Sequence, residues 1–464
     1  MTGMRDSVRT LGVAGVALLL LTSCGSDDQE RPPEDQPTVM EGAGHTAEGV
    51  ELPETASGEA AGDVLEIINA EQDSTESDWE GRLAESFTEE VSAEELAQTV
   101  NSQFRPVGPW TAVEHEDFDD ASLTTLEAQE GQELEMQLAL DEDGLIEGLF
   151  FAEPREPVEP AEGFEEIDER LTDLPGEVHA VVVQDDETLL EVSDGEAAPL
   201  ASVAKLYVVL ALVEAVDAGE VSWDDTLEVT EELRSLPSGT LQDQPAGYET
   251  TVFDVAQRMI QISDNTGTDM LIDLLGRDAV EQAVADSGHQ DPSLMEPFPS
   301  TREMFQLRWG FPDLGEDWKD GDAEERREIL EEIGEEDLEI TDEDVAADDV
   351  DFDIDWYATP EDLTSLYDQL FDAMEEHPEL DAVLASNPGL TFGDFSPEDL
   401  WWDTLAFKGG SLPGVLNGAW RAQDEDGTVR TVILLTQHED AEALSEEAEE
   451  IFSLAEDALT LEAP

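Results

Sequence analysis

Ser202-Val203-Ala204-Lys205, Ser263-Asp264-Asn265 and Lys408-Gly409-Gly410-Ser411 follow one another along this chain of 464 residues. Their patterns are S-x-x-K, then S-D-N, then K-x-G. The chain holds only three lysines, and two of them stand in these stretches, whereas Lys319 lies in an acidic stretch with no motif around it. Each short pattern alone is a weak signal. Found in this order in so lysine-poor a sequence, the three predict that the fold brings their side chains into one site.

Ser202 and Lys205 have the spacing of a nucleophile and its base. A serine hydroxyl is a poor nucleophile until a base takes its proton, and residues three apart on a helix face the same side. Apolar residues surround the pair: Leu200, Tyr207, Leu210 and Val213. Because burial and a second ammonium group both favour a neutral lysine, we expect Lys205 to be the base toward Ser202. An N-cap serine followed by a solvated lysine would give the same four letters.

The other two stretches fit the remaining tasks of acyl transfer. Ser263-Asp264-Asn265 falls on a turn between two helical patterns, where the Ser263 hydroxyl can relay a proton and the Asn265 amide can bind a substrate amide. Lys408-Gly409-Gly410 is expected to end a strand, where the ammonium can bind a carboxylate and Gly410 lets a substrate lie against the edge. The N–H groups of Ser202 and Ser411 are candidates for an oxyanion hole. A helix cap and a glycine hairpin are the alternatives.

The composition is extremely acidic, with 119 Asp and Glu against 19 Lys and Arg, and a formal net charge of -100. Such self-repulsion destabilises a folded chain at low ionic strength, and concentrated salt screens it. We therefore expect a protein that works in high salt; an acid-facing surface protein is the alternative. Binding to nucleic acid or to an anionic membrane surface is disfavoured.

The N-terminal 24 residues have the features of a lipoprotein signal peptide. Arg5 and Arg9 precede an apolar run from Leu11 to Leu21, and Leu21-Thr22-Ser23-Cys24-Gly25 resembles a bacterial lipobox. Cys24 is the only cysteine, which excludes an internal disulfide. We expect cleavage before Cys24, lipidation of its thiol and attachment to the outer face of the cell membrane through the lipid alone. Residues 25–58, rich in Asp, Glu, Pro and Gly, are expected to form a disordered tether.

A first domain is expected over residues 59–154. Helical spacing occurs around Val64 to Ile68 and at Trp79, Leu83 and Phe87; Ser92-Ala93-Glu94-Glu95 is a capping box for a third helix. Leu134 to Leu140 alternates as a strand, and Asp141-Glu142-Asp143-Gly144 turns it into the next. Helices followed by an antiparallel sheet resemble the small cone-shaped α+β domains of the steroid-isomerase type. A proline-rich linker, residues 154–160, follows.

The second domain is expected over residues 161–464. A helix and two strands precede Ser202, helical patterns dominate until about residue 400, and three strand patterns and a last helix follow. The last helix carries Leu444, Ala448, Ile451, Ala455 and Leu459 on one stripe. Strands at both ends of a helical block predict a sheet flanked by helices. Residues 310–355, which are acidic and weakly periodic, are expected to be a surface insertion.

Ser202–Lys205, Ser263–Leu271 and Lys408–Gly414 resemble class A serine β-lactamases and related penicillin-binding proteins, and Thr359-Pro360-Glu361-Asp362-Leu363 resembles the T-T-P segment of that fold. The resemblance implies an α+β domain with an antiparallel sheet flanked by helices and a helical subdomain. It implies Ser202 as nucleophile, Lys205 as base, Ser263 as proton relay, and Lys408, Gly410 and Ser411 as the substrate edge, with no cofactor and no metal. With its lipobox and first domain, the chain resembles actinobacterial lipoproteins that join a steroid-isomerase-like domain to a β-lactamase-like one, a group that includes a protein of clavulanic acid gene clusters.

Two departures from the class A pattern stand out. Gly409 replaces the Thr or Ser of K-T-G, and the text nearest to R-x-E-x-x-L-N is Arg302-Glu303-Met304-Phe305-Gln306-Leu307-Arg308, with both spacings off by one and no asparagine. Glu303 is thus a weak candidate for the deacylating base, a surface-loop acid being the alternative. We expect acylation without efficient deacylation.

Three functions remain open at this point. The leading one is an acyl-serine hydrolase acting on β-lactams or related amides and esters; a D,D-peptidase or esterase with the same serine is the second. The third is a non-catalytic module that binds β-lactams or peptidoglycan. The six histidines pair with no serine or metal motif, which disfavours a histidine triad or a zinc enzyme. We expect a monomer.

Overall fold

The computed structural model describes residues 49–384 and 402–463 apart from short gaps. The gaps are residues 51, 54, 71, 80, 85–86, 89–90, 119–120, 129–130, 142–143, 153–157, 186, 194, 335, 337, 339, 342–343, 346–349, 375–376, 425–426 and 462. The predicted signal peptide, the lipobox with Cys24, the tether as far as residue 48, and residues 154–157 of the predicted linker lie outside the described residues. Within the described ranges, no helix combines the length and the apolar character that crossing a bilayer requires.

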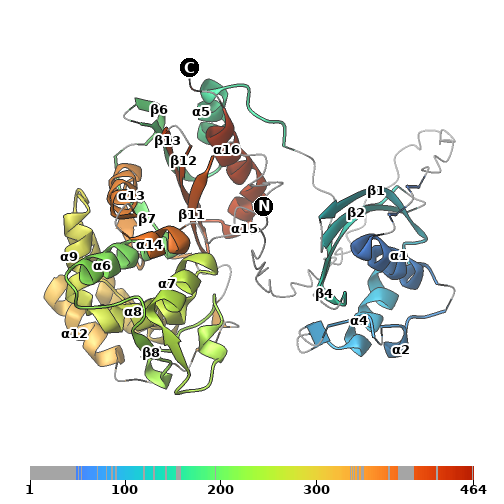
Figure 1. Ribbon diagram of the computed structural model, residues 1–464, viewed down its shortest axis with the longest axis horizontal. Helices are drawn as coiled ribbons and strands as arrows, with labels where there is room; N and C mark the ends of the chain where they lie inside the picture. The colour runs from blue at the N-terminus through green and yellow to red at the C-terminus, as the bar shows by residue number, and fades with distance from the viewer. Residues whose placement is uncertain are drawn as a thin grey trace, which may run out of the picture. The chain divides into compact units, whose positions relative to one another are not determined.

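Contacts between Cα atoms divide the chain into two units, Met1–Pro157 and Val158–Pro464. The first unit places helices before a four-stranded antiparallel sheet in the order β1-β2-β3-β4 (Figure 1). Its elements are α1 (Ala56–Asn69), α2 (Glu76–Trp79), α4 (Ala93–Thr99), the π-helix η1 (Val100–Phe104), β1 (Trp110–Phe118), β2 (Ala121–Ala128), β3 (Glu133–Leu140) and β4 (Ile146–Ala152). Alternate residues of β2 and β3 are buried, and α1 packs on the buried side.

Of two helix predictions in the first unit, the structure confirms one and contradicts the other. The capping box is present, since Ser92 Oγ accepts from the Glu95 N–H and Glu95 Oε2 accepts from the Ser92 N–H. The single helix predicted from Trp79, Leu83 and Phe87 is wrong, because α2 ends at Trp79 and Leu83 forms a β-bridge with Ile146. All three side chains are buried in one core. Their regular spacing therefore arises from burial in that core and not from a shared helix.

The start of this unit also differs from the prediction. Helix α1 begins at Ala56, and the Val50 N–H donates to the Ala112 carbonyl at 2.8 Å. Residues 56–58, assigned to the tether, therefore belong to a folded helix. Thr55 is the N-cap, and its hydroxyl accepts from the Gly58 N–H. The residues around this cap are small or acidic, so the sequence shows no apolar periodicity there that would indicate the start of a helix.

The second unit is built on a five-stranded antiparallel sheet in the order β11-β12-β13-β5-β6. The strands are β11 (Thr404–Leu412), β12 (Val415–Gln423), β13 (Val429–Gln437), β5 (Glu177–Gln184) and β6 (Glu187–Val192). Residues of central strand β13 alternate between two cores: Val432 and Leu434 face one, and Ile433 and Leu435 face the other. A strand buried on both faces needs helices on both sides.

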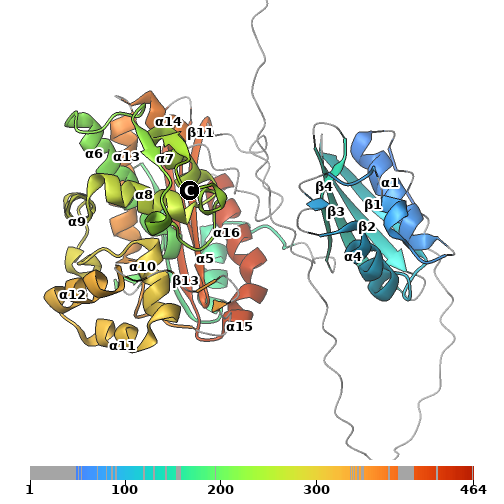
Figure 2. The ribbon, with the colours of Figure 1, turned by 90° about the horizontal axis from the view of Figure 1, so that it is seen from below.

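Helices cover both faces of this sheet. On one face lie α5 (Phe164–Asp173) and α16 (Ala448–Thr460), which close the smaller core with the sheet (Figures 1 and 2). On the other face lie α6 (Lys205–Asp217) and α13 (Pro360–Met374), continued by a helical region. That region holds α7 (Val252–Gln261), α8 (Asn265–Leu275), α9 (Arg277–Asp286), α10 (Thr301–Phe305), α11 (Pro312–Asp320), α12 (Ala323–Gly334) and α14 (Pro378–Leu384).

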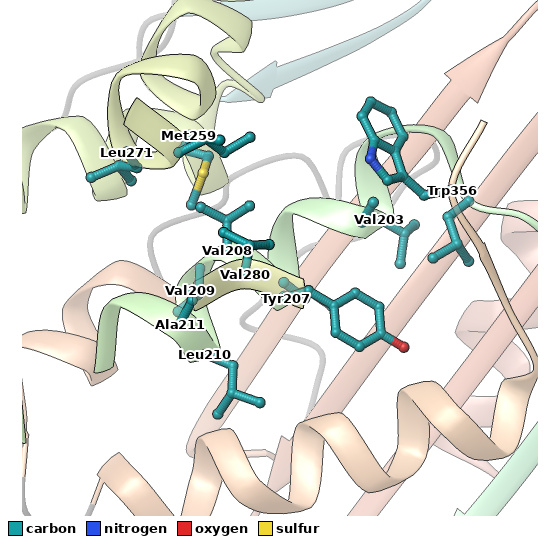
Figure 3. Packing of buried hydrophobic residues seen from close by; sticks show 14 of the residues in the cluster. Val203, Tyr207, Val208, Val209, Leu210, Ala211, Met259, Leu271, Val280 and Trp356 are labelled. Atoms are coloured by element: carbon teal, nitrogen blue, oxygen red, sulfur yellow. The ribbon is translucent and has the colours of Figure 1, made fainter. Parts of the chain in front are cut away.

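Helix α6 is apolar on all sides because it runs through the middle of the larger core. Every residue from Lys205 to Val213 is buried. Figure 3 shows Val208 near Met259 of α7 and Val280 of α9, whereas Leu210 points to the other side of α6. A helix held from several sides positions the residues at its N-terminal end rigidly, and Ser202 and Lys205 lie there.

Three expectations about the second unit need correction. The chain forms a 3-10 turn, η2 (Ala201–Ala204), at Ser202, and the α-helix begins only at Lys205. Strand β11 does not end at Gly410 but runs on to Leu412, because it stays paired with β12 throughout. The last helix is interrupted at Glu447, so that α15 (Ala441–Glu446) precedes α16.

The predicted surface insertion, residues 310–355, is in large part packed structure. Helices α11 and α12 lie within it, and Trp318, Ile329, Leu330 and Ile333 are buried in the larger core. The acidic residues between them masked this spacing in the sequence. At the end of the segment, β10 (Tyr357–Ala358) pairs with β7 (Ala198–Pro199) just before Ser202.

Candidate active site

The structure brings Ser202 and Lys205 together at the start of α6. Lys205 Nζ lies 3.0 Å from Ser202 Oγ. The turn before the helix holds Ala201 at φ 48°, a conformation that costs a residue with a side chain of order 1–3 kcal/mol. The surrounding fold must therefore impose it. This strained turn presents the Ser202 hydroxyl to the lysine.

Lys205 also contacts the S-D-N stretch. Its Nζ lies 2.9 Å from Ser263 Oγ, 2.6 Å from the Ser263 carbonyl and 2.6 Å from Asn265 Oδ1. Burial lowers the pKa of Lys205 to about 7, although the negative charges of Asp264 and Asp269 oppose the shift. A substantial fraction of Lys205 is thus neutral near pH 7 and able to accept a proton from Ser202.

Lys408 approaches the same hydroxyl from strand β11. Its Nζ lies 2.9 Å from Ser263 Oγ and donates to the Gly409 carbonyl at 2.8 Å. Its side chain is buried, and burial together with the charge of Lys205 holds its pKa well below the usual value of 10.5. Two ammonium groups beside one hydroxyl repel each other. The state with both amines charged is therefore disfavoured relative to states in which at least one amine is neutral.

The turn that carries Ser263 is fixed by its neighbours. Ser263 has φ 56°, a second strained residue in the site. Asp264 is fully buried: its Oδ1 accepts from the Gly267 N–H and caps α8, while its Oδ2 accepts from the N–H groups of Thr240 and Leu241. Asn265 Nδ2 donates to the Leu236 carbonyl. Asp264 is therefore structural, and it leaves Ser263 and Asn265 facing Lys205.

Gly410 lets strand β11 lie directly against the nucleophile turn. A Cβ atom at this position would come within 2.4 Å of the Leu200 carbonyl oxygen and 3.0 Å of the Ser202 nitrogen. Any side chain would force the two segments apart. Ser411, the next residue along β11, lines the same cavity as Ser202.

These residues open into a cavity of about 950 Å³. Ser202, Ser263, Asn265, Lys408, Gly410 and Ser411, predicted from the sequence, all line it. Among the described residues that line it there is no aspartate or glutamate. In a chain with 119 acidic residues, this leaves Lys408 as the ionisable side chain in the described lining, with Lys205 in contact with two lining residues, Ser202 and Ser263.

Glu303 does not reach the cavity. It lies on α10, where its carboxylate accepts from the Ser300 N–H at 2.7 Å in a capping box and pairs with Arg277 Nη2 at 2.7 Å. The side chain is largely buried, so neither alternative from the sequence fits: it is not a base beside Ser202, and it is not a surface-loop acid. Its cap and its partner turn it away from the nucleophile.

Asp355 belongs to no sequence motif, yet its buried carboxylate accepts a 2.8 Å hydrogen bond from the Ala201 N–H beside the nucleophile. Nothing in the amino-acid sequence distinguishes Asp355 from the many acidic residues around it. Only the apolar residue after it, Trp356, which also lines the cavity, could have suggested burial. In the described part of the chain, no group of His, Cys, Asp and Glu side chains is arranged to hold a metal ion.

Comparison with known proteins agrees with this architecture. Residues 164–377 match a family model described as "Beta-lactamase enzyme family", and residues 52–146 match one described as "ORF 12 gene product N-terminal". The first match takes in Ser202, Lys205 and the S-D-N stretch and ends before Lys408. No curated protein matches the chain.

Similar solved structures include β-lactamases from three bacteria. The one from Sphaerobacter thermophilus is 24% identical, covering 64% of this chain and 95% of that chain with a TM-score of 0.46. A class A representative from Bacteroides cellulosilyticus is 20% identical, over 64% and 95% with a TM-score of 0.46. The one from Chitinophaga pinensis is 19% identical, over 63% and 98% with a TM-score of 0.44. The family match and the sheet with its flanking helices give the second unit a β-lactamase-like fold.

Proposed function

We propose that this protein is a serine hydrolase of β-lactamase type that forms an acyl-enzyme at Ser202, with β-lactams or related amides and esters as substrates. One observation carries the proposal: Lys205 Nζ lies within hydrogen-bond distance of both Ser202 Oγ and Ser263 Oγ. A structural lysine has no reason to be buried between two hydroxyls with its pKa lowered to about 7, because the burial is costly.

The residues divide the reaction among them. Ser202 Oγ attacks the substrate carbonyl and gives its proton to neutral Lys205. The proton then passes through Ser263, which both lysines contact, to the leaving nitrogen or oxygen as its bond to carbon breaks. A substrate carboxylate binds at Lys408, because its negative charge favours the protonated form of that lysine, and the N–H groups of Ser202 and Ser411 stabilise the oxyanion.

Deacylation is proposed to be slow. Water must be held against the ester and deprotonated by a group within about 3 Å of it. The nearest candidate in the sequence, Glu303, is held by Arg277 and Ser300, and the described lining of the cavity contains no carboxylate. The acyl-enzyme should therefore accumulate.

The second candidate is a D,D-peptidase or esterase that uses the same serine. Slow release of a β-lactam is equally expected of such an enzyme, since it too would be trapped as an ester. A non-catalytic binding module is less favoured, because a binding site needs neither a neutralised lysine nor a strained serine turn.

Intact mass spectrometry after incubation with a penicillin tests the proposal. Wild-type protein should gain the mass of the penicillin within minutes and lose it slowly, and Ser202→Ala should gain nothing. Ser445→Ala is the matched control, because Ser445 borders the same cavity but its hydroxyl donates to the Ala441 carbonyl. An adduct on Ser202→Ala, or no adduct on the wild type with penicillins and activated esters alike, would overturn it.

We also propose that the mature protein is a monomer, anchored outside the cell by a lipid on Cys24, with a β-lactam or a peptidoglycan-like molecule as its small partner. The lipobox and the short apolar run before it support the anchor. Cys24→Ser should leave an unprocessed precursor or release the protein. Normal processing and unchanged membrane retention would count against lipidation.

A further inference from the structure

Helix α10 turns an apolar face, not an acidic one, toward the cavity of Ser202. Thr301, Met304 and Phe305 line the cavity; they are three and four residues apart, so they share one side of a helix. Glu303 lies on a different side and is paired with Arg277. The segment nearest to R-x-E-x-x-L-N in the sequence thus contributes a thioether and a phenyl ring to the cavity, and its glutamate, the weak candidate for the deacylating base, is held elsewhere.

Other segments extend the same apolar wall. Leu236 comes from the loop that Asn265 holds through its carbonyl, Ile262 from the residue before the S-D-N stretch, and Trp356 from the residue after Asp355; all three line the cavity. Together with Met304 and Phe305 they form what we call the α10 wall. Four of these five side chains, all but Ile262, are at most 7% exposed, so they are held in place rather than free to rearrange.

The α10 wall and Ser202 border one cavity of about 950 Å³. Ser202, Ser263 and Lys408 account for only part of its described lining, and most of the rest of that lining is apolar. Apolar walls around the remaining space favour an apolar occupant, because transferring each methylene from water is favourable. An occupant there would also exclude water from the ester.

We propose that the α10 wall is a subsite for an extended apolar acyl chain, so that the preferred substrates are esters or amides of medium-chain acyl groups. This rests on the acyl-serine function proposed above and specifies its substrate class. In the step concerned, Ser202 Oγ forms a bond to the acyl carbon and the bond from that carbon to the leaving oxygen or nitrogen breaks. The proton of Ser202 passes through Lys205 and Ser263 to the leaving group, and the chain then lies along Met304 and Phe305.

Acylation kinetics with p-nitrophenyl acetate, butyrate and octanoate, each below its micellar concentration, test the proposal. The second-order rate constant for acylation should rise by roughly twofold to fourfold per added methylene. Met304→Gln should reduce the octanoate-to-acetate ratio about tenfold or more. Met295→Gln is the matched control: Met295 is equally buried, at 2% against 3% exposed, but it does not line the cavity, so it should leave the ratio unchanged.

The octanoate-to-acetate ratio distinguishes a loss of the subsite from a loss of folded protein. Because acetate is measured on the same variant, a general loss of folded protein lowers both rates and leaves the ratio intact. Acylation of Ser202 that is equally fast with acetate and octanoate would overturn the subsite, as would an equal loss of preference in Met295→Gln. If no ester or penicillin acylates Ser202, the proposed function itself fails.

Discussion

Asp355 holds the residue that precedes the nucleophile: its Oδ1 accepts a hydrogen bond from the Ala201 N–H at 2.8 Å. The same oxygen accepts from the Trp356 N–H at 2.7 Å. Ala201 is kept in a left-handed conformation, at φ 48°, and Gly410 lies close against the same turn. A carboxylate from the end of the 310–355 segment thus helps to fix the direction in which Ser202 Oγ points.

We predict that Asp355 is a positioning residue for Ser202. Asp355→Ala should slow acylation about 10- to 100-fold, because it leaves buried N–H groups unpaired at about 1–3 kcal/mol each and each 1.4 kcal/mol is tenfold in rate. Asp355→Asn should stay within about threefold of wild type, since the amide oxygen accepts the same hydrogen bonds. Stopped-flow acylation with p-nitrophenyl acetate measures both.

A rescue experiment distinguishes positioning from general stability. Glycine adopts a positive φ without strain, so Ala201→Gly combined with Asp355→Ala should acylate faster than Asp355→Ala alone. Thermal unfolding of each variant gives the stability separately. If Asp355→Ala lowers the unfolding midpoint but folded protein acylates at the wild-type rate, Asp355 does not position the nucleophile.

The acylation rate should depend on the protonation of Lys205. With an uncharged ester it should rise as pH increases through about 7, because only neutral Lys205 accepts the proton and its pKa is lowered to about 7, chiefly by burial. Lys205→Met removes the titrating amine while keeping the site apolar, so it should slow acylation and abolish the rise through about pH 7.

The third lysine supplies the control for this titration. Lys319 lies outside the cavity, paired with Glu316 and Asp351, and Lys319→Met should leave the midpoint in place. A pH profile that still rises through about 7 in Lys205→Met would mean that Lys205 is not the base toward Ser202.

Glu303→Gln should change stability but not catalysis. The Arg277 guanidinium would lose an ion pair with both carboxylate oxygens, at 2.7 and 3.0 Å, which should lower the unfolding free energy by about 1 kcal/mol or more. A glutamine can still complete the capping box, so α10 should remain formed. Mass spectrometry should show the same acylation and the same slow loss of adduct as in wild type. A longer-lived adduct would identify Glu303 as the deacylating base after all.

Much of the candidate site could be predicted from the sequence because its chemistry leaves few choices. Ser202, Lys205, Ser263 and Lys408 belong to short patterns, and lysines are rare in this chain. A sheet flanked by helices could also be predicted, since strand patterns such as the apolar run from Val432 to Leu435 in β13 stand on both sides of a helical block. These signals are local or compositional, and tertiary structure does not have to be known to see them.

What could not be predicted depends on contacts between distant segments. Whether Glu303 faces Ser202 or Arg277 is decided by the rotation of α10, which a shift of one residue changes by about 100°. Asp355 meets Ala201 across 154 positions, and nothing distinguishes it among so many acids. In the same way, Trp79, Leu83 and Phe87 share a core but not a helix.

Salt should stabilise this protein strongly. With a formal net charge of -100, carboxylates repel one another across the surface, and folding brings them closer than they are in the unfolded chain. The Debye length falls from about 10 Å at 0.1 M salt to about 3 Å at 1 M, so most of the repulsion should be screened in that range. The unfolding midpoint, followed by circular dichroism from dilute buffer to 2 M NaCl, should rise by several degrees or more. Betaine at equal osmolality is the control, because it is a net-neutral zwitterion that barely screens charge, and its effect should be smaller. A midpoint that stays flat or falls with NaCl would show that charge repulsion does not limit stability and would refute adaptation to high salt.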